Sequence, residues 1–398
     1  MHGQSLASEL LANDDFTNSY SNYKFWKGQI PRTQMLNLFS WQHLNHALAT
    51  SRITNDRLRL SVKDGYEQPN NQAFRTVRDA FGRPTDALSI NELHRLMAQG
   101  VTGVLEAVNE LFPDIAAFTQ VLGARYYARS TANAYFSFGS TSGFGAHNDD
   151  HDVIVMQIEG RKSWRFFGTK DKPSMATVDD LKKPREENVS EILILNEGDV
   201  LFVPKGTWHD VVAINEPSLH LTISVVYPTV ADYAQWLLGQ HKYELPYRDI
   251  KLSDDVLDSV VKGSAHFFST VINKESIATF LDSYYARHAA SRIQPSFPHL
   301  NRPQAGDFFR RVPFTATEVK LINDSSEEHM ILALGKKYTL SRCEFSVFNN
   351  LHHDRSVSLD HILGLAEANT SWLDINIAIE KLLDYGLLSK STQASTLQ

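Results

Sequence analysis

The chain has 398 residues, of which 42% are hydrophobic and 21% are charged, the composition of an ordinary globular protein. This length is too great for one compact core and predicts two or three domains. The net charge of −7 argues against a protein that coats nucleic acid, because neutralising phosphate requires an excess of lysine and arginine. The single cysteine, Cys343, excludes an intrachain disulfide framework and a cysteine-based zinc cluster.

The first residues lack the basic segment and apolar stretch of a signal peptide. No apolar run approaches the ~20 residues that span a bilayer. We therefore expect a soluble, cytoplasmic protein with no membrane partner.

Residues 1–125 are expected to be helical and mixed. From Ser89 to Leu122 the apolar residues recur at helical spacing, with Pro113 as an interruption. These helices are expected to pack on the outside of a sheet.

Between Ala128 and Pro228 the hydrophobic period changes to two, which is typical of strands. Glu197–Asp199 and Pro204–Gly206 predict two tight turns around one buried strand, as in a jelly-roll corner. Several short strands at regular spacing indicate a sandwich or barrel. The expected strands are 133–139, 152–158, 162–168, 191–196, 199–204, 208–214 and 220–227.

After Pro228 the pattern is helical again, at 231–240, 253–271 and 274–293, followed at 294–309 by a proline-containing stretch typical of a linker or an extended crossing segment. From about Phe314 a strand-like piece and two or three helices are expected. Residues 358–390 are typical of a helix-turn-helix that leads into a short wing.

In a DNA-binding domain, the second helix of this helix-turn-helix, at 372–385, would be the recognition helix. It carries Asp374, Glu380 and Asp384 against the single cation Lys381. Carboxylates repel phosphate, so the pattern disfavours nucleic-acid binding and favours a protein-interaction or dimer-stabilising role.

Two residues two apart, His147 and Asp149, could present an imidazole and a carboxylate on one face of a strand. A second histidine, His209, follows a predicted jelly-roll corner, where distant strands lie side by side. Two histidines and one carboxylate form the facial triad of non-haem Fe(II) oxygenases, which leaves positions open for cosubstrate and oxygen. His151 is a competing ligand, ranked lower because the chain is expected to bend there. His220 is another, expected instead to line the core or the pocket.

Lys162 lies on the next predicted strand, among apolar residues. A lysine that points into a barrel needs an anionic partner, because an unpaired buried charge is costly. A dicarboxylate cosubstrate would provide that partner. From periodicity alone, Lys162 could equally face outward beside Arg161 and Arg165.

Three stretches match a known pattern. The first follows HxDxxDxFxxQxxGxKxW at His147, Asp149, Asp152, Gln157, Gly160, Lys162 and Trp164. The second follows GDxLYxPxGxxH at Gly198, Asp199, Leu201, Pro204, Gly206 and His209, and the third follows HxT at His220 and Thr222. Together they resemble the JmjC-domain ribosomal oxygenases, which are protein hydroxylases of bacteria and eukaryotes.

The resemblance implies an Fe(II)- and 2-oxoglutarate-dependent oxygenase that uses O2 to hydroxylate a protein side chain, a ribosomal protein being one option, and releases succinate and CO2. It implies that His147, Asp149 and His209 bind iron. Lys162 would pair with the distal carboxylate of 2-oxoglutarate. Tyr135 would hydrogen-bond the same carboxylate, Ser224 would line that region, and Asn133 would lie near the substrate.

The resemblance also implies an α+β architecture built on a double-stranded β-helix, the jelly roll of cupin and JmjC proteins. Residues 1–228 would form the catalytic domain with its N-terminal helices. Residues 229–300 would form a helical segment that makes a homodimer, and residues 301–398 a winged-helix-like domain.

Asn148 and Ile154 are among the positions that depart from the family pattern. Asn148 replaces a residue that is usually aromatic, and Ile154 replaces one that is often phenylalanine. Neither removes a metal ligand, but Asn148 puts the family's substrate in doubt. The alternatives are the same chemistry on a peptide natural product or a free amino acid, and a cupin metal enzyme that does not use 2-oxoglutarate.

Overall fold

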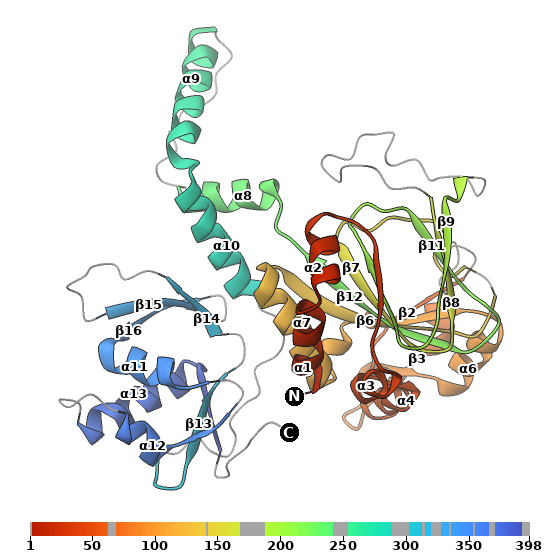
Figure 1. The fold of residues 1–398 in the computed structure, drawn as a ribbon, viewed down its shortest axis with the longest axis horizontal. Coiled ribbons are helices and arrows are strands. Elements are labelled where there is room, and N and C mark those ends of the chain that lie inside the picture. Colours follow the sequence, from red (N-terminus) through yellow and green to blue (C-terminus); the bar gives the residue numbers. More distant parts are fainter. Residues whose placement is uncertain are drawn as a thin grey trace.

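Two facing β-sheets form the centre of the N-terminal half of the protein (Figure 1). The computed structural model describes residues 2–62, 69–140, 142–167, 188–241, 254–288, 302–312, 315–319, 328–333, 336–352, 355–365 and 371–391. The larger sheet has the order β1 (Trp26–Gln29), β10 (Asp199–Val203), β7 (Asp152–Glu159), β12 (Ser218–Val226), β6 (Arg129–Ser137), β5 (Thr102–Leu105) and β2 (Leu58–Ser61). The smaller sheet has the order β11 (His209–Ala213), β8 (Lys162–Phe166) and β9 (Glu191–Leu195).

Strand β7 is buried on both faces, which explains its almost continuous apolar sequence. Val153 and Val155 pack with residues of the smaller sheet, such as Trp164. Ile154 and Met156 point the other way, into the core beneath the N-terminal helices. The strand therefore joins the two hydrophobic layers of the domain.

The N-terminal helices cover the outer face of the larger sheet, as predicted (Figure 1). They are α1 (His2–Leu11), α2 (Asp14–Ser21), α3 (Arg32–Leu38), α4 (Trp41–Thr50), α5 (Asn70–Ala73), α6 (Ile90–Ala98), the short 3-10 helix η1 (Val108–Glu110) and α7 (Pro113–Tyr126). Strands β3 (Phe74–Arg78) and β4 (Pro84–Leu88) form a separate hairpin.

All seven strands predicted between Ala128 and Pro228 are present, so this part of the fold is confirmed. The helical prediction for Ser89–Leu122 was wrong in its middle, because Thr102–Leu105 forms β5. All four residues of β5 are buried between β6 and β2, and this tertiary pairing overrides the helical spacing. Pro113 begins α7 instead of interrupting it, since the first helical position needs no N–H donor.

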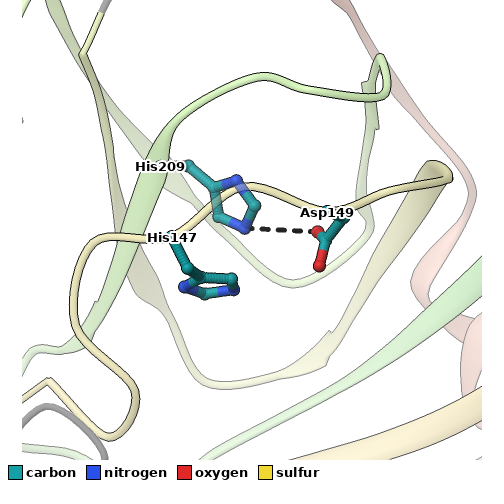
Figure 2. Close-up of side chains that lie close together, drawn as sticks. All are labelled: His147, Asp149 and His209. Atoms are coloured by element: carbon teal, nitrogen blue, oxygen red, sulfur yellow. Dashed lines mark ion pairs between the residues drawn. The ribbon is translucent and has the colours of Figure 1, made fainter. Parts of the chain in front are cut away.

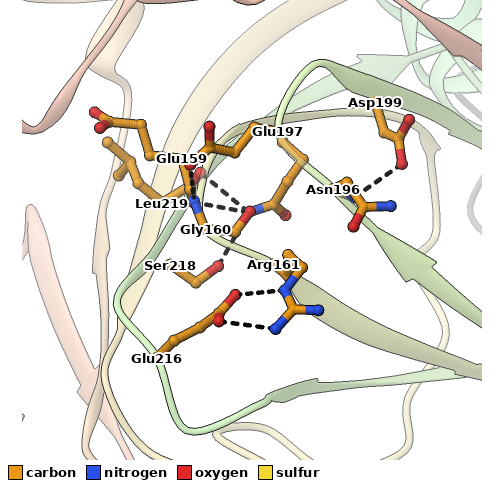
Figure 3. Close-up of polar contacts among 10 residues, drawn as sticks. Glu159, Gly160, Arg161, Asn196, Glu197, Asp199, Glu216, Ser218 and Leu219 are labelled. Carbon is orange, nitrogen blue, oxygen red and sulfur yellow. Dashed lines mark hydrogen bonds and ion pairs between the residues drawn. The ribbon is translucent and has the colours of Figure 1, made fainter.

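The turn between β7 and β8 depends on Gly160 (Figure 3). Its backbone has φ +66°, and its N–H donates to Glu197 Oε1 at 3.0 Å. The neighbouring Gln157 amide donates to Ser218 Oγ at 3.0 Å and to the Glu159 carbonyl at 3.0 Å. A Cβ on Gly160 would lie 1.9 Å from the carbonyl oxygen of Pro217, so only glycine fits where β8 starts.

Gly160→Ala is expected to lower the free energy of unfolding by about 2–3 kcal/mol, because the methyl group clashes with backbone at a left-handed φ. Urea denaturation would measure the change. Gly239→Ala is the matched control, since nothing lies within 4 Å of its Cβ position in helix α8. It should be neutral or stabilise by up to about 1 kcal/mol, and equal effects of the two changes would contradict this reading of the turn.

The three helices predicted after Pro228 are confirmed as α8 (Val230–Gln240), α9 (Asp254–Val271) and α10 (Lys274–His288). Helix α9 projects away from the rest of the molecule (Figure 1). Dimerisation through this segment stays a prediction. Across the described ranges, no helix combines the length and the apolar character needed to cross a membrane.

The C-terminal part has its own hydrophobic core, with Phe309, Val347 and Ile379 among its members. Its elements are β13 (Phe308–Arg311), β14 (Thr315–Val319), β15 (Glu328–Ala333), β16 (Lys336–Ser341), α11 (Arg342–Asn350), β17 (Val357–Ser358), α12 (Leu359–Gly364), α13 (Trp372–Asp384) and β18 (Leu388–Ser391). Its two sheets have the orders β17-β13-β18 and β14-β15-β16.

Helices α12 and α13 are the two helices expected within residues 358–390. The stretch 294–309, expected to be a linker or an extended crossing segment, ends in extended strand, where Phe308 and Phe309 pair with β17 and β18. Residues 294–301 lie outside the described ranges. The winged-helix assignment and the three domain boundaries stay predictions.

Candidate metal centre

His147, Asp149 and His209 lie close together, and Figure 2 shows their side chains side by side. Each offers a ligand atom, and these atoms all lie within 4.8 Å of one another. His209 Nε2 is 3.6 Å from Asp149 Oδ2, and the two imidazole centroids are 4.4 Å apart. One ion could therefore contact all three side chains.

The backbone fixes the two histidines opposite each other. His147 N donates to the His209 carbonyl at 2.9 Å, and His209 N donates to the His147 carbonyl at 2.8 Å. This is an isolated bridge, and Asp149 follows it in irregular backbone instead of the regular strand that was expected. The two side chains of the predicted pair still reach one site.

The Nδ1 atom of each imidazole is already hydrogen-bonded to a backbone carbonyl. His147 Nδ1 lies 2.8 Å from the Gly145 oxygen, and His209 Nδ1 lies 2.9 Å from the Thr207 oxygen. A carbonyl only accepts, so each Nδ1 carries the proton and each Nε2 keeps its lone pair. This is the arrangement by which proteins orient metal-binding histidines.

Burial and the neighbouring His147 lower the pKa of His209 to about 4. Its side chain is only 4% exposed. The imidazole is therefore neutral near pH 7, as a metal ligand must be.

The turn before His209 is tied to the segment that follows Asp149. Lys205 N donates to the buried carboxylate of Asp152 at 2.8 Å, and Gly206 N donates to the Asp149 carbonyl at 2.9 Å. Burial raises the pKa of Asp152. Two bonds thus hold the chain segments that carry two of the three candidate ligands.

The competing histidines lie nearby but outside this group. His151 lines the cavity that the three candidate ligands also line, and its Nδ1 is 2.8 Å from Asp150 Oδ1. His220 lines the cavity further along, where it stacks on Tyr135 with ring centroids 4.9 Å apart. The expectation that His220 lines the pocket therefore agrees with its place.

Lys162 points into the jelly roll, not outward. Strand β8 alternates, with Lys162 buried and Arg165 on the partly exposed face. Within the described part of the chain, no hydrogen bond or ion pair reaches the Lys162 amine, and burial lowers its pKa to about 7. Arg161 is turned away and pairs with Glu216 at 2.9 Å (Figure 3).

The three weaker sequence candidates line the same cavity of about 290 Å³. Tyr135 and Asn133 come from β6, and Ser224 comes from the adjacent strand β12. Burial raises the pKa of Tyr135 to about 12, so it is a neutral hydroxyl. The Asn133 oxygen accepts from Ala107 N at 2.9 Å, which leaves its amide nitrogen available to a ligand.

Several residues of the cavity wall were not singled out for it from the sequence. Trp164 matched the family pattern, and it stacks on His209 with centroids 5.3 Å apart. Arg59 and Thr102 come from β2 and β5, and Phe144 lies 4.8 Å beneath the Arg59 guanidinium. No sequence signal marked Arg59 or Thr102, because neither strand was predicted.

Residues 110–233 match the JmjC domain family. The chain contains a JmjC domain. It is 26% identical over 224 residues to the "bifunctional lysine-specific demethylase and histidyl-hydroxylase NO66" of Drosophila grimshawi, covering 54% of this chain and 29% of that protein. It is 30% identical over 112 residues to "ribosomal oxygenase 1" of Gallus gallus, covering 27% and 18% respectively. The chain thus spans less than a third of either relative.

The JmjC domain and its surroundings also resemble solved structures. The Escherichia coli ribosomal oxygenase YcfD, in complex with cobalt and succinic acid, superposes with a TM-score of 0.59 at 13% identity. The match covers 95% of this chain and 98% of YcfD. A second YcfD structure, in complex with cobalt and 2-oxoglutarate, gives a TM-score of 0.58 at 14% identity over 95% and 98%. This likeness confirms the jelly-roll fold.

Proposed function

We propose that the protein is an Fe(II)- and 2-oxoglutarate-dependent oxygenase that hydroxylates a protein side chain and releases succinate and CO2. The observation that carries the proposal is one cavity with two unusual features. The first feature is the group of candidate ligands in the cavity wall, His147, Asp149 and His209. The second is the buried, unpartnered amine of Lys162, which lines the same cavity. Neither feature is explained by stability alone.

The three candidate ligands suit Fe(II). Two imidazoles with Nε2 lone pairs and one carboxylate are the donor set of non-haem iron oxygenases. In this proposal His147, Asp149 and His209 hold the ion and leave its other positions to cosubstrate and oxygen. The structurally similar protein YcfD was solved in complex with cobalt, which supports a divalent ion at this site.

Lys162 suits a dicarboxylate. Its amine is buried, and the adjacent His220 Nδ1 is also buried without a hydrogen-bond partner. Groups of this kind are costly unless a ligand satisfies them. The distal carboxylate of 2-oxoglutarate would pair with Lys162, and the hydroxyl of Tyr135 and the region of Ser224 would complete that end of the cavity.

When bound, iron would activate O2, which would oxidise 2-oxoglutarate to succinate and CO2 and hydroxylate the substrate side chain. The chain's own residues then have three tasks. Lys162 anchors the cosubstrate. The two histidines and Asp149 fix the position of the metal ion, and Asn133 offers its amide to the substrate. The apolar wall around Trp164 and Val153 excludes water from the reacting groups.

A protein substrate is proposed from the relatives, whose names include a histidyl-hydroxylase and a ribosomal oxygenase. A ribosomal protein is the substrate to try first. Homodimerisation through α8–α10, a cytoplasmic location and the absence of nucleic-acid binding remain part of the proposal. Asn148 is the position where substrate choice would differ from the relatives.

The direct test is succinate production by the purified protein with Fe(II), 2-oxoglutarate and O2, first alone and then with ribosomal proteins. Slow succinate formation alone, stimulated by a protein that gains one oxygen atom by mass spectrometry, is the expected result. No succinate from an iron-loaded protein would overturn the proposal.

The binding of 2-oxoglutarate should take up a proton above pH 7. Below that pH the Lys162 amine is already charged, whereas above it the amine is neutral in the free protein and must be protonated to pair with a carboxylate. The affinity should fall by up to about tenfold per pH unit above 7. Calorimetry in buffers of different ionisation enthalpy would count the protons. Equal uptake at pH 6 and pH 8.5 would contradict the lowered pKa of Lys162.

A further inference from the structure

Helix α13 exposes an apolar surface on the C-terminal domain. Trp372, Leu373 and Ile377 are 59%, 60% and 52% exposed. The opposite side of the helix already supplies the domain core through residues such as Ile375 and Ile379. The outer residues are therefore not needed for packing within the described chain, and exposed apolar groups of this kind mark interaction sites.

The apolar surface continues into an acidic one on the same side of the helix. Leu373 and Ile377 are four residues apart. Glu380 lies seven residues after Leu373, and Asp384 lies seven residues after Ile377, so all four side chains form one stripe along the helix. We call the surface formed by Trp372, Leu373, Ile377, Glu380 and Asp384 the α13 face.

The charge of the α13 face is not cancelled by the helix itself. The single cation of α13, Lys381, is turned toward α11, where it bonds Glu344 at 2.7 Å. Arg302 lies 3.6 Å from Glu380, but it is 90% exposed, and such a pair contributes little. A partner's cation could replace Arg302 at small cost.

The N-terminal end of the face is held in place. Ser371 caps the helix, accepting from Asp374 N at 3.1 Å, while Asp374 Oδ2 accepts from the Ser371 hydroxyl at 2.7 Å. Trp372, the next residue, is thus presented on an ordered turn. An ordered aromatic with a low entropy cost is an effective anchor for a protein partner.

We propose that the α13 face is a docking site for a basic, amphipathic segment of another protein. Apolar side chains of the partner would cover Trp372, Leu373 and Ile377, and its lysines or arginines would pair with Glu380 and Asp384. Nucleic acid does not fit, because its phosphates would meet these carboxylates. A second copy of the chain fits less well, because it would bring two acidic stripes to one interface.

The test uses the full chain and a fluorescein-labelled, 18-residue amphipathic peptide with leucine on one face and arginine on the other. Fluorescence anisotropy should show micromolar binding that weakens as salt is added. The same peptide with glutamate in place of arginine should not bind. Ile377→Glu should weaken binding at least tenfold, and so should the double variant Glu380→Lys and Asp384→Lys. These side chains are at the surface, and a thermal melt would verify that the variants are folded.

Matched controls separate the face from the general negative charge of the chain. Phe81→Glu makes the same kind of change at an apolar residue that is even more exposed, 82% against 52% for Ile377, and Glu9→Lys with Asp56→Lys makes the same change in net charge elsewhere. Both should bind the peptide as the wild type does. No peptide binding, or equal loss in the controls, would overturn the proposal. It would also be overturned if Ile377→Glu dissociated a wild-type oligomer, or if the face bound duplex DNA in preference.

Discussion

Asp149→Ala is expected to lower metal-dependent succinate formation about 1,000-fold or more, which corresponds to about 4 kcal/mol in the activation barrier. The change removes the one carboxylate among the three candidate ligands, so the ion would lose both a ligand and charge neutralisation. Initial rates at saturating Fe(II) and 2-oxoglutarate would measure the effect. Fe(II) affinity, measured anaerobically, should fall in parallel.

The neighbouring carboxylate provides the matched control. Asp150 is 92% exposed and pairs with His151 instead of the candidate ligands. Asp150→Ala should leave the rate within about twofold of the wild type. If the two variants lost activity equally, or if His151→Ala lost as much as Asp149→Ala, the assignment of the ligands would be wrong.

Lys162→Met is expected to raise the KM for 2-oxoglutarate about 100-fold or more, while Fe(II) affinity changes little. A buried carboxylate left without its cation costs about 3–5 kcal/mol, and methionine keeps most of the lysine volume. The free protein should be as stable as the wild type or more stable, because the variant no longer buries an unpartnered amine. Kinetics across 2-oxoglutarate concentrations and urea denaturation would measure the two effects.

Arg161→Met is the control for this variant, since Arg161 is the adjacent cation and faces outward to Glu216. Its KM for 2-oxoglutarate should be unchanged. An unchanged KM in Lys162→Met would show that the lysine is not the anchor, and would favour a cupin enzyme of different chemistry.

The strands of the jelly roll could be predicted because their signals are local. Residues 152–158 and 199–203 are short apolar runs bounded by turn residues, and Gly198 and Gly206 adopt the positive φ values that the turns require. Strand β5 could not be predicted, because its four residues continue a helical spacing and become a strand only through pairing with β6 and β2. Strand β2 could not be predicted for the same reason, and neither could the place of its residue Arg59 in the cavity wall.

The candidate site was predictable in part. The spacing of His147 and Asp149, with a later histidine after a jelly-roll corner, predicted that these three candidate ligands lie together, and the structure places them within 4.8 Å of one another. Periodicity could not decide whether Lys162 faces inward, since its strand is flanked by Arg161 and Arg165. The pairing of β8 between β11 and β9 decides the direction of Lys162, because this pairing turns Lys162 and Trp164 to the same buried side.

The most direct test of the proposed oxygenase chemistry is anaerobic titration of the metal-free protein with Fe(II) and 2-oxoglutarate, followed by absorbance spectroscopy. We expect a metal-to-ligand charge-transfer band that requires both components, is lost in Asp149→Ala and needs far more 2-oxoglutarate in Lys162→Met. On exposure to oxygen the band should decay as succinate forms. A protein that binds Fe(II) but gives no band and no succinate would contradict the proposed chemistry.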